Sequence, residues 1–116
     1  MKYIKLVLEN LDIKPNSEIK GNITVDYPGA YDGIVINTLI MNSNELIVYK
    51  SYNDVKISDN VSRLFISKDV MPDNKAKFTA VIEFEPEQSH DVKFRDSIIE
   101  QHKEVESDKL FAKFSA

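Results

Sequence analysis

Residues 17–46 read SEIKGNITVDYPGAYDGIVINTLIMNSNEL and contain the clearest structural signal in the chain. The first part alternates apolar residues or glycine with polar and charged residues, which is typical of a β-strand with one buried and one solvated face. A loop at Pro28-Gly29 ends this pattern. The second part is apolar on both faces, which indicates a central strand or one that meets a partner. We expect strands at Ser17–Tyr27 and Gly33–Asn42, with the rest of the chain packed against this pair.

Similar patterns recur along the chain, separated by turn residues. Further strands are expected at Lys2–Glu9, Leu46–Tyr52, Val61–Ser67, Ala76–Glu85 and Lys109–Ser115. Turn clusters lie between them, for example at Lys14–Ser17, Ser58–Asn60 and Met71–Asn74. Seven or eight antiparallel strands of this kind predict an all-β, immunoglobulin-like sandwich. The core between its sheets is expected to contain Phe65, Phe78, Phe84 and Phe114.

The segment His90–Glu106 admits two interpretations. Val92 and Phe94 fit a strand, whereas the four residues Ser97–Glu100 match a helix capping box. Too few apolar residues follow the box to form the buried face of a helix. We therefore expect extended structure or a long hairpin.

Composition limits the possible functions. The chain has 116 residues, so residues 1–116 are expected to form a single domain. The net charge of -4 disfavours a nucleic-acid partner, because such a partner needs cations to neutralise its phosphates. The sequence has no cysteine, no apolar run long enough to span a membrane and no signal-peptide pattern at its start. These features favour a cytoplasmic protein without stable membrane insertion.

Few residues are suited to catalysis or to metal binding. The two histidines are His90 and His102. On a strand, His102 would share one face with Glu100, Glu104 and Glu106, which would suit a hard divalent cation. A solvated acidic edge is the simpler interpretation. No serine lies in a nucleophile elbow, and there is no phosphate-binding glycine loop. We expect no enzyme activity, no metal site and no cofactor.

Four tyrosines are the best candidates for contact with a partner: Tyr27, Tyr31, Tyr49 and Tyr52. Aromatic side chains are common in binding hot spots. Tyr27 and Tyr31 flank the Pro28-Gly29 loop and would offer an aromatic surface to a protein or, alternatively, to a carbohydrate or other small ligand. The alternative to both kinds of binding is that the tyrosines pack within the sheets.

The predicted strand Leu46–Tyr52 is rich in β-forming residues and carries one charge, Lys50. At the edge of a sheet it would be unprotected against pairing with another chain. We expect it to pair either inside the sheet or with a second copy of this protein, which would give a homodimer.

Residues 11–49 also carry short motifs of a known family. Residues 14–25 match a Pro-Gly turn followed by an alternating strand, with Asn16 in place of the usual glycine. Residues 35–42 match the next alternating strand, with Asn42 where glycine is common. Asparagine tolerates the left-handed backbone conformation that glycine adopts at such positions. The runs 63–66 and 78–84 are similar to later strands, and in these features the chain resembles the arrestin superfamily.

The resemblance implies a single-domain, arrestin-like or sporulation-control-like β-sandwich of microbial origin, because the chain has room for one of the two sandwiches of a full arrestin. It also implies a non-catalytic scaffold or adaptor that holds protein partners at its strand edges and loops. The charged core of full arrestins needs two domains and a tail, so it is not assigned to residues of this chain.

Overall fold

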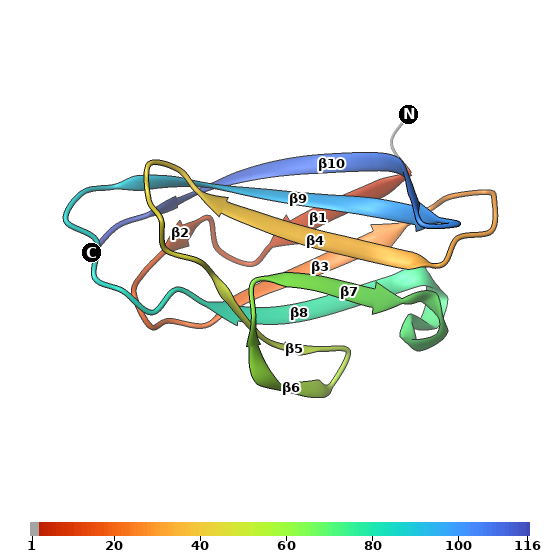
Figure 1. Ribbon diagram of the computed structural model, residues 1–116, viewed down its shortest axis with the longest axis horizontal. Helices are drawn as coiled ribbons and strands as arrows, with labels where there is room; N and C mark the ends of the chain where they lie inside the picture. Colours follow the sequence, from red (N-terminus) through yellow and green to blue (C-terminus); the bar gives the residue numbers. More distant parts are fainter. Residues whose placement is uncertain (1–2) are drawn as a thin grey trace.

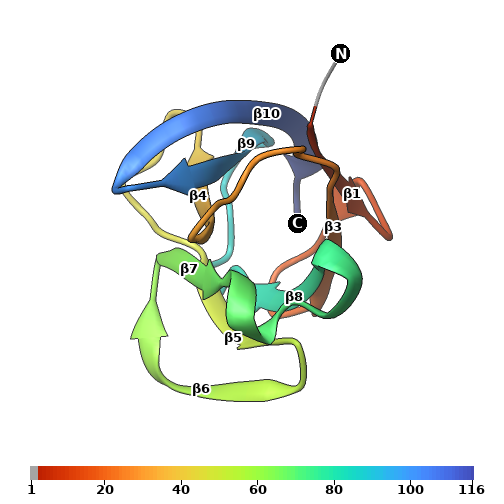
Figure 2. The same ribbon diagram turned by 90° about the vertical axis from the view of Figure 1, so that its right-hand side faces the viewer.

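The computed structural model describes residues 3–116 as two facing β-sheets (Figures 1 and 2). The strands are β1 (Ile4–Leu8), β2 (Asp12–Ile13), β3 (Ile19–Val25), β4 (Gly33–Ile40), β5 (Val48–Tyr52), β6 (Val55–Val61), β7 (Arg63–Ser67), β8 (Lys75–Val81), β9 (His90–Glu100) and β10 (Lys103–Phe114). The first sheet has the order β1-β3-β8-β5-β6, and the second has the order β2-β10-β9-β4-β7. The predicted all-β sandwich is confirmed.

Two short 3-10 turns, at Lys68–Val70 and Pro72–Asn74, connect β7 to β8. Within residues 3–116, no helix is both long and apolar enough to cross a membrane.

The described part of the chain contains ten strands rather than seven or eight. β2 is a two-residue strand that pairs in parallel with the end of β10, too short to give a periodic signal. β6 lies where a turn at Ser58–Asn60 was expected. It stands at the edge of the first sheet and projects from the sandwich, so it needs no alternating apolar face (Figures 1 and 2). The first predicted strand began at Lys2, which lies outside the described residues.

β3 shows the predicted alternation, with every second side chain buried. It pairs with β1 on one side and with β8 on the other. A Cβ atom at Gly21 would lie 2.5 Å from two ring atoms of Phe78. Glycine therefore suits this strand position because a neighbouring aromatic ring fills the space of a side chain.

β4 lies in the second sheet, between β7 and β9, and forms no ladder with β3. The expectation that these two strands form the pair on which the fold is built is therefore wrong. Each is instead an inner strand of one layer, and the Pro28-Gly29 loop carries the chain from one layer to the other. Strand pairing joins residues far apart in sequence, which local periodicity does not specify.

The segment from His90 onward forms the expected long hairpin. β9 and β10 pair over most of their lengths, and the turn between them is Gln101-His102. Both turn residues have positive φ angles, 51° and 65°. This is the backbone signature of a tight two-residue hairpin turn whose twist matches that of the strands.

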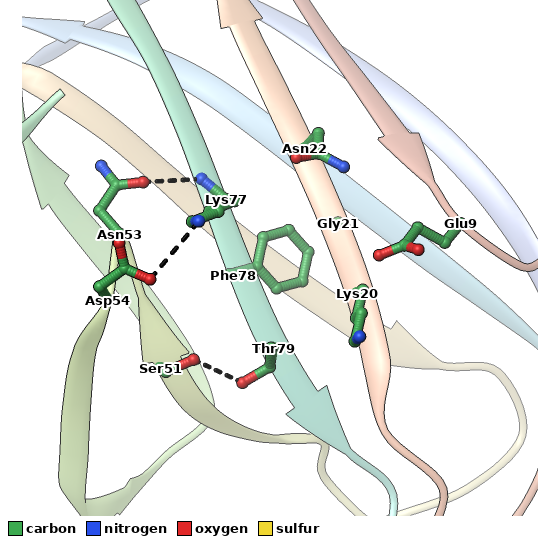
Figure 3. Close-up of a pocket in the computed structure, with 10 residues that line it drawn as sticks. All are labelled: Glu9, Lys20, Gly21, Asn22, Ser51, Asn53, Asp54, Lys77, Phe78 and Thr79. Carbon is green, nitrogen blue, oxygen red and sulfur yellow. Dashed lines mark hydrogen bonds and ion pairs between the residues drawn. The ribbon is translucent and has the colours of Figure 1, made fainter. Parts of the chain in front are cut away.

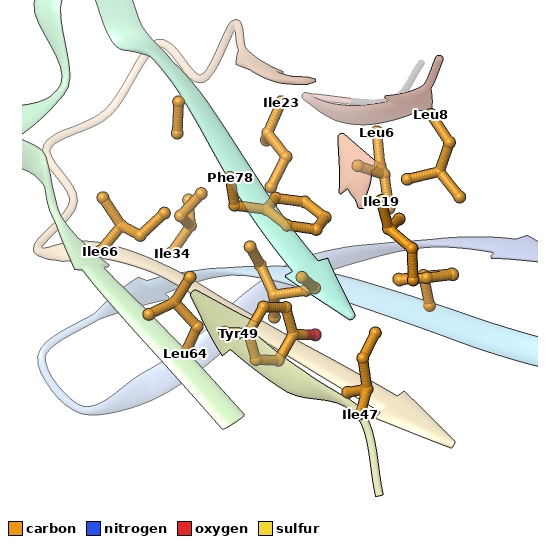
Figure 4. Close-up of a cluster of buried hydrophobic side chains, with 14 of the residues drawn as sticks. Leu6, Leu8, Ile19, Ile23, Ile34, Ile47, Tyr49, Leu64, Ile66 and Phe78 are labelled. Carbon is orange, nitrogen blue, oxygen red and sulfur yellow. The ribbon is translucent and has the colours of Figure 1, made fainter. Parts of the chain in front are cut away.

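The core between the sheets is almost entirely aliphatic and aromatic (Figure 4). Phe78 and Phe114 are buried in it, as predicted. Phe84 is half-buried and packs edge-on against Phe114, with ring centroids 5.2 Å apart. Phe65 is 50% exposed, so its predicted place in the core is wrong. Its neighbours Leu64 and Ile66 point inward, and alternation then directs residue 65 outward.

Acidic side chains of β10 connect the two sheets along one corner. The backbone N–H of Tyr3 donates to Oε2 of Glu106 at 3.0 Å, and that of Leu6 donates to Oδ2 of Asp108 at 3.3 Å. Further along, the N–H of Lys113 donates to the carbonyl of Leu11. The N-terminal segment thus leaves the first sheet at β1 and joins the second at β2. The carboxylates accept hydrogen bonds from backbone N–H groups in and just before edge strand β1, which would otherwise be free to pair with another chain.

Candidate functional site

The structure brings Tyr27 and Tyr31 together, but packs them against the protein. Their ring centroids are 6.4 Å apart in an edge-to-face arrangement. The Tyr31 side chain is buried, and its hydroxyl donates to Oδ1 of Asn74 at 2.8 Å. The Tyr27 hydroxyl donates to Oε2 of Glu100 at 3.2 Å. Burial raises the pKa of both phenols above its ordinary value. These rings therefore close one end of the sandwich, and only Tyr27 offers part of its surface to a partner.

Tyr49 belongs to the core rather than to a contact surface. It is 0% exposed, and its hydroxyl makes a hydrogen bond with the Thr38 hydroxyl of the opposite sheet. Tyr52 is half-buried at the end of β5. β5 itself pairs with β8 and β6, so this strand pairs inside the sheet, as one of the two expectations had it. The sheet edges are formed instead by β1, β6, β2 and β7.

The acidic residues around His102 do not converge. His102 lies in the hairpin turn, while Glu100 accepts a hydrogen bond from Tyr27 and Glu106 accepts one from Tyr3. Among the described residues, no group of three or more histidine, aspartate or glutamate side chains is placed to hold a metal ion. A one-residue irregularity in β10 between Glu104 and Glu106 breaks the shared face that the sequence pattern suggested.

A shallow pocket of about 290 Å³ lies on the outer surface of the first sheet, over β3, β8 and β5 (Figure 3). It is lined by Glu9, Lys20, Gly21, Asn22, Ser51, Asn53, Asp54, Lys77, Phe78 and Thr79. A second hollow of about 390 Å³ shares Asn22, Asn53, Asp54 and Lys77 with it. The two form one polar groove across the strands.

Much of the polar lining of this groove is already engaged within the protein. The Asn53 amide oxygen accepts from the backbone N–H of Lys77 at 2.9 Å, and its nitrogen donates to the Val70 carbonyl at 2.6 Å. The Ser51 and Thr79 hydroxyls bond each other at 2.6 Å (Figure 3). These side chains join the strands. Lys77 also pairs with Asp54 at 3.4 Å, and Lys20 pairs with Glu18 at 3.5 Å. The lining thus leaves chiefly Glu9 and Asn22 to face a ligand.

The outer surface of the second sheet has a different composition. Strand register places Arg63 of β7, Asn37 of β4, Arg95 of β9 and Lys109 of β10 in one row across four strands. Leu39, Lys93 and Phe111 form the next row on the same side. On the other side of the basic row, Phe65 pairs with Val35. We call this surface the basic face: Arg63, Lys93, Arg95 and Lys109 with Leu39, Phe65 and Phe111.

The apolar residues of the basic face are unusually exposed. The exposed fraction is 50% for Phe65, 52% for Leu39 and 55% for Phe111. Scattered exposed apolar residues are ordinary, but large ones gathered on one face mark interaction sites. One sign of this surface was visible in the sequence, because the predicted strand Gly33–Asn42 is apolar on both sides.

One ion pair orders the centre of the basic face. Arg95 Nη2 donates to Oε2 of Glu104 at 2.5 Å, and the Ser97 hydroxyl donates to Oε1 of the same carboxylate at 2.5 Å. These two hydrogen bonds hold the pKa of Glu104 below its ordinary value. Beside them, Val35, Arg63, Phe65, Ile99 and His102 line an open hollow of about 360 Å³. The face thus combines a fixed guanidinium with an apolar depression.

No protein-family model and no curated protein sequence matches this chain. Solved structures match its fold. The human F-spondin reeler domain is 11% identical, with a TM-score of 0.56, and the match covers 96% of this chain and 89% of that one. A conjugative transposon lipoprotein from Bacteroides eggerthii is 7% identical, with a TM-score of 0.58 and full coverage of both chains. The Salmonella SafD adhesin is 11% identical, with a TM-score of 0.51, covering 99% of this chain and all of that one.

At these identities the comparisons establish the fold alone, which is a small immunoglobulin-like β-sandwich. None of the three is described as an arrestin, so the arrestin resemblance stays a prediction.

Proposed function

We propose that this protein is a non-enzymatic interaction module that binds a protein partner through the basic face. The observation that carries the proposal is the gathering of Phe65, Leu39 and Phe111, each at least half exposed, around a row of cations. Aromatic residues and arginine are the types most enriched in binding hot spots. The surface lies on the strands of a packed sheet, so it needs little ordering when a partner binds.

Two further points support a binding role. The SafD protein, which shares the fold, is described as an adhesin. The arrestin resemblance, which is part of this proposal, implies a scaffold that holds protein partners. Among the four edge strands, we propose β6 and β7 as those that hold partners, and β7 is also part of the basic face.

Site-specific crosslinking tests the proposal. A photoreactive phenylalanine analogue is placed at residue 65 or residue 39, and at residue 7 as the control. Val7 is as exposed as Phe65, at 50%, but lies on the first sheet. We expect one protein to be captured from the source cells at residues 65 and 39 and not at residue 7, and its capture to be lost in an Arg63→Glu/Lys109→Glu variant. Equal capture at all three positions, or capture that ignores the charge reversal, would overturn the proposal.

The second candidate is binding of a carbohydrate or another small polar ligand. Tyr31 is buried, so the tyrosine loop is a poor platform, and the groove of Figure 3 is the better place. Its Lys20 and Asn22 side chains are exposed beside the Gly21 backbone. Titration of a glycan library should then give saturable chemical-shift changes at Lys20 and Asn22, and Asn22→Ala should abolish them. No shift change in the groove would remove this candidate.

We keep the cytoplasm as the proposed location, supported by the absence of cysteine from the sequence. The Bacteroides protein of the same fold is described as a lipoprotein, which points to the cell surface as the alternative. Fractionation of the source cells with an antibody readout separates the two.

A further inference from the structure

The charges of this protein are unevenly distributed. The chain has a net charge of -4, yet the basic face presents four cations, of which Arg95 pairs with Glu104. In the row beyond Lys93 on the same side, Lys113 pairs with Asp91. Acidic residues gather instead in the loop between β8 and β9, where Glu83–Glu87 reads EFEPE and all three glutamates are exposed. We call Glu83–Glu87 the acidic segment.

The acidic segment lies at one end of the sandwich, with Phe84 and Pro86 packed inward and its three glutamates exposed. It follows β8 and precedes β9, on the side of the molecule where the C-terminus lies (Figure 1). Glu85 and Glu87 line an open hollow together with Glu45 of the β4–β5 connection. Leu46, next to Glu45, is 61% exposed. This end therefore offers carboxylates with an exposed apolar side chain beside them, which complements the cations and apolar residues of the basic face.

The basic face and the acidic segment lie on different sides of the molecule. The basic row lies on the strands of the second sheet, whereas the acidic segment belongs to a loop beyond the strand ends. Lys50 forms one contact to the segment within the chain, 3.8 Å from Glu83, and leaves Glu85 and Glu87 facing outward.

We propose that the basic face binds the acidic segment of a second copy of this protein. This inference rests on the proposed function, since it names a partner for the same surface. The two surfaces differ, so the contact is heterologous: each copy can use its face for one neighbour and its acidic segment for another. Such contacts build open chains unless the rotation between copies closes a ring.

The association is expected to be weak and dependent on salt. The charges on both surfaces are exposed, and exposed ion pairs contribute little individually. Salt screens them over about 8 to 10 Å at moderate ionic strength. Contact of Leu46 with Leu39, Phe65 or Phe111 adds the burial of apolar surface.

Sedimentation velocity of the purified protein, over a concentration series at low and high salt, tests the proposal. Arg63→Gln/Lys109→Gln removes charge from the face, and Glu85→Gln/Glu87→Gln removes charge from the segment. Lys5→Gln/Lys20→Gln on the first sheet is the matched control for the loss of two cations. We expect reversible growth beyond a dimer for the wild-type protein and the control. Each test variant alone should associate about fivefold more weakly or worse.

Mixing the two test variants gives the decisive result. Each retains one intact surface, so an equimolar mixture should form a heterodimer that stops at two chains. A wild-type protein that stays monomeric at low salt would overturn the proposal. So would association that both test variants retain, or a mixture that fails to form a heterodimer.

Self-association and the proposed binding of a partner can fail independently, and the two experiments distinguish these failures. If the wild-type protein is monomeric but crosslinking at residues 65 and 39 still captures a different protein, only the self-association is wrong. If crosslinking captures nothing at those residues and no association occurs, both fail.

Discussion

The ring of Phe78 occupies the space that a side chain at Gly21 would need, since a Cβ at residue 21 would lie 2.5 Å from ring atoms Cε1 and Cζ. Both residues are buried, on paired strands of the first sheet, at directly opposed positions. Because the hydrogen-bond ladder sets the spacing of β3 and β8, a side chain at residue 21 would have to displace the ring.

Gly21→Ala should therefore destabilise the protein by about 1 to 3 kcal/mol, the usual cost of overpacking a core. Urea denaturation measures the loss, with the exposed Asn22→Ala as the control. In a Phe78→Leu background the same change should cost less, because the smaller side chain vacates the site. An equal cost in both backgrounds would show that the ring is not responsible.

Asp108→Ala should cost about 1 to 3 kcal/mol, because it leaves the partly buried N–H of Leu6 without its acceptor. Asp108→Asn retains an acceptor oxygen and should cost less. The exposed Asp26→Ala is the control. Hydrogen exchange at the Leu6 amide offers a second readout, and it should accelerate in the alanine variant alone. Unchanged exchange would mean that Asp108 does not hold β1.

Stability should fall in the alkaline range because of Tyr49. Burial raises the pKa of this phenol above its ordinary value of 10.0. A group whose pKa is higher in the folded state contributes stability that is fully present below the unfolded pKa and is lost as the pH rises above it. The midpoint of urea unfolding should decline above about pH 10.

In the Tyr49→Phe variant, the midpoint of urea unfolding should decline less steeply with rising pH. Part of the decline should remain, because the pKa values of Tyr27 and Tyr31 are also raised in the folded protein. At neutral pH the substitution should cost about 0.5 to 1.5 kcal/mol for the lost hydrogen bond to Thr38. Parallel pH profiles for the wild-type protein and the variant would contradict this assignment.

Glu104 should act at the opposite end of the pH scale. The hydrogen bond from Arg95 lowers the pKa of Glu104 from the ordinary 4.5. The ionised carboxylate therefore contributes to folding stability above pH 4.5, and this contribution is lost as the pH falls through the folded pKa. The carboxylate is 39% exposed, so Glu104→Gln should cost less than about 1 kcal/mol at neutral pH. The difference from the wild-type protein should vanish in acid. A difference that persists there would indicate lost packing instead.

Phe65→Ser should lower the unfolding free energy by only about 1 kcal/mol, because half of the ring is exposed and the other half packs on Gly33. The buried Phe114→Ala should cost about 3 to 5 kcal/mol. If Phe65→Ser nevertheless abolishes capture of a partner, the ring serves binding rather than folding. A large loss of stability would instead place Phe65 in the packed structure.

Alternation predicted individual strands well wherever one face is buried. β1, β3 and β8 each bury every second residue, as their sequences suggested. The same rule applied to Arg63–Ser67 directs Phe65 outward, which the expectation of an aromatic core overlooked. Asp96 shows that residue type alone does not predict burial. It is 0% exposed because it falls on the inward side of β9, where a carboxylate is least expected.

The assignment of strands to sheets could not be predicted, because it depends on contacts between distant residues. β6 was missed because an edge strand needs no apolar alternation. The basic face was missed because Arg63, Arg95 and Lys109 come from three separate strands. Only strand register brings these residues into one row. The four candidate tyrosines were conspicuous in the sequence, but the hydroxyls of Tyr27, Tyr31 and Tyr49 have partners inside the fold.

The corner between β1–β2 and β10 has a mechanical consequence. Its contacts advance together along both segments, from Tyr3 with Glu106, through Leu6 with Asp108 and Leu11 with Lys113, to Ile13 with Ser115. The two segments therefore run in the same direction, with the start of β1 and the finish of β10 at opposite ends of a body 44 Å long (Figure 1). Tension applied at those two points would load the contacts together in shear, rather than peel them apart one at a time. The same corner that closes the sandwich would make it resist being stretched.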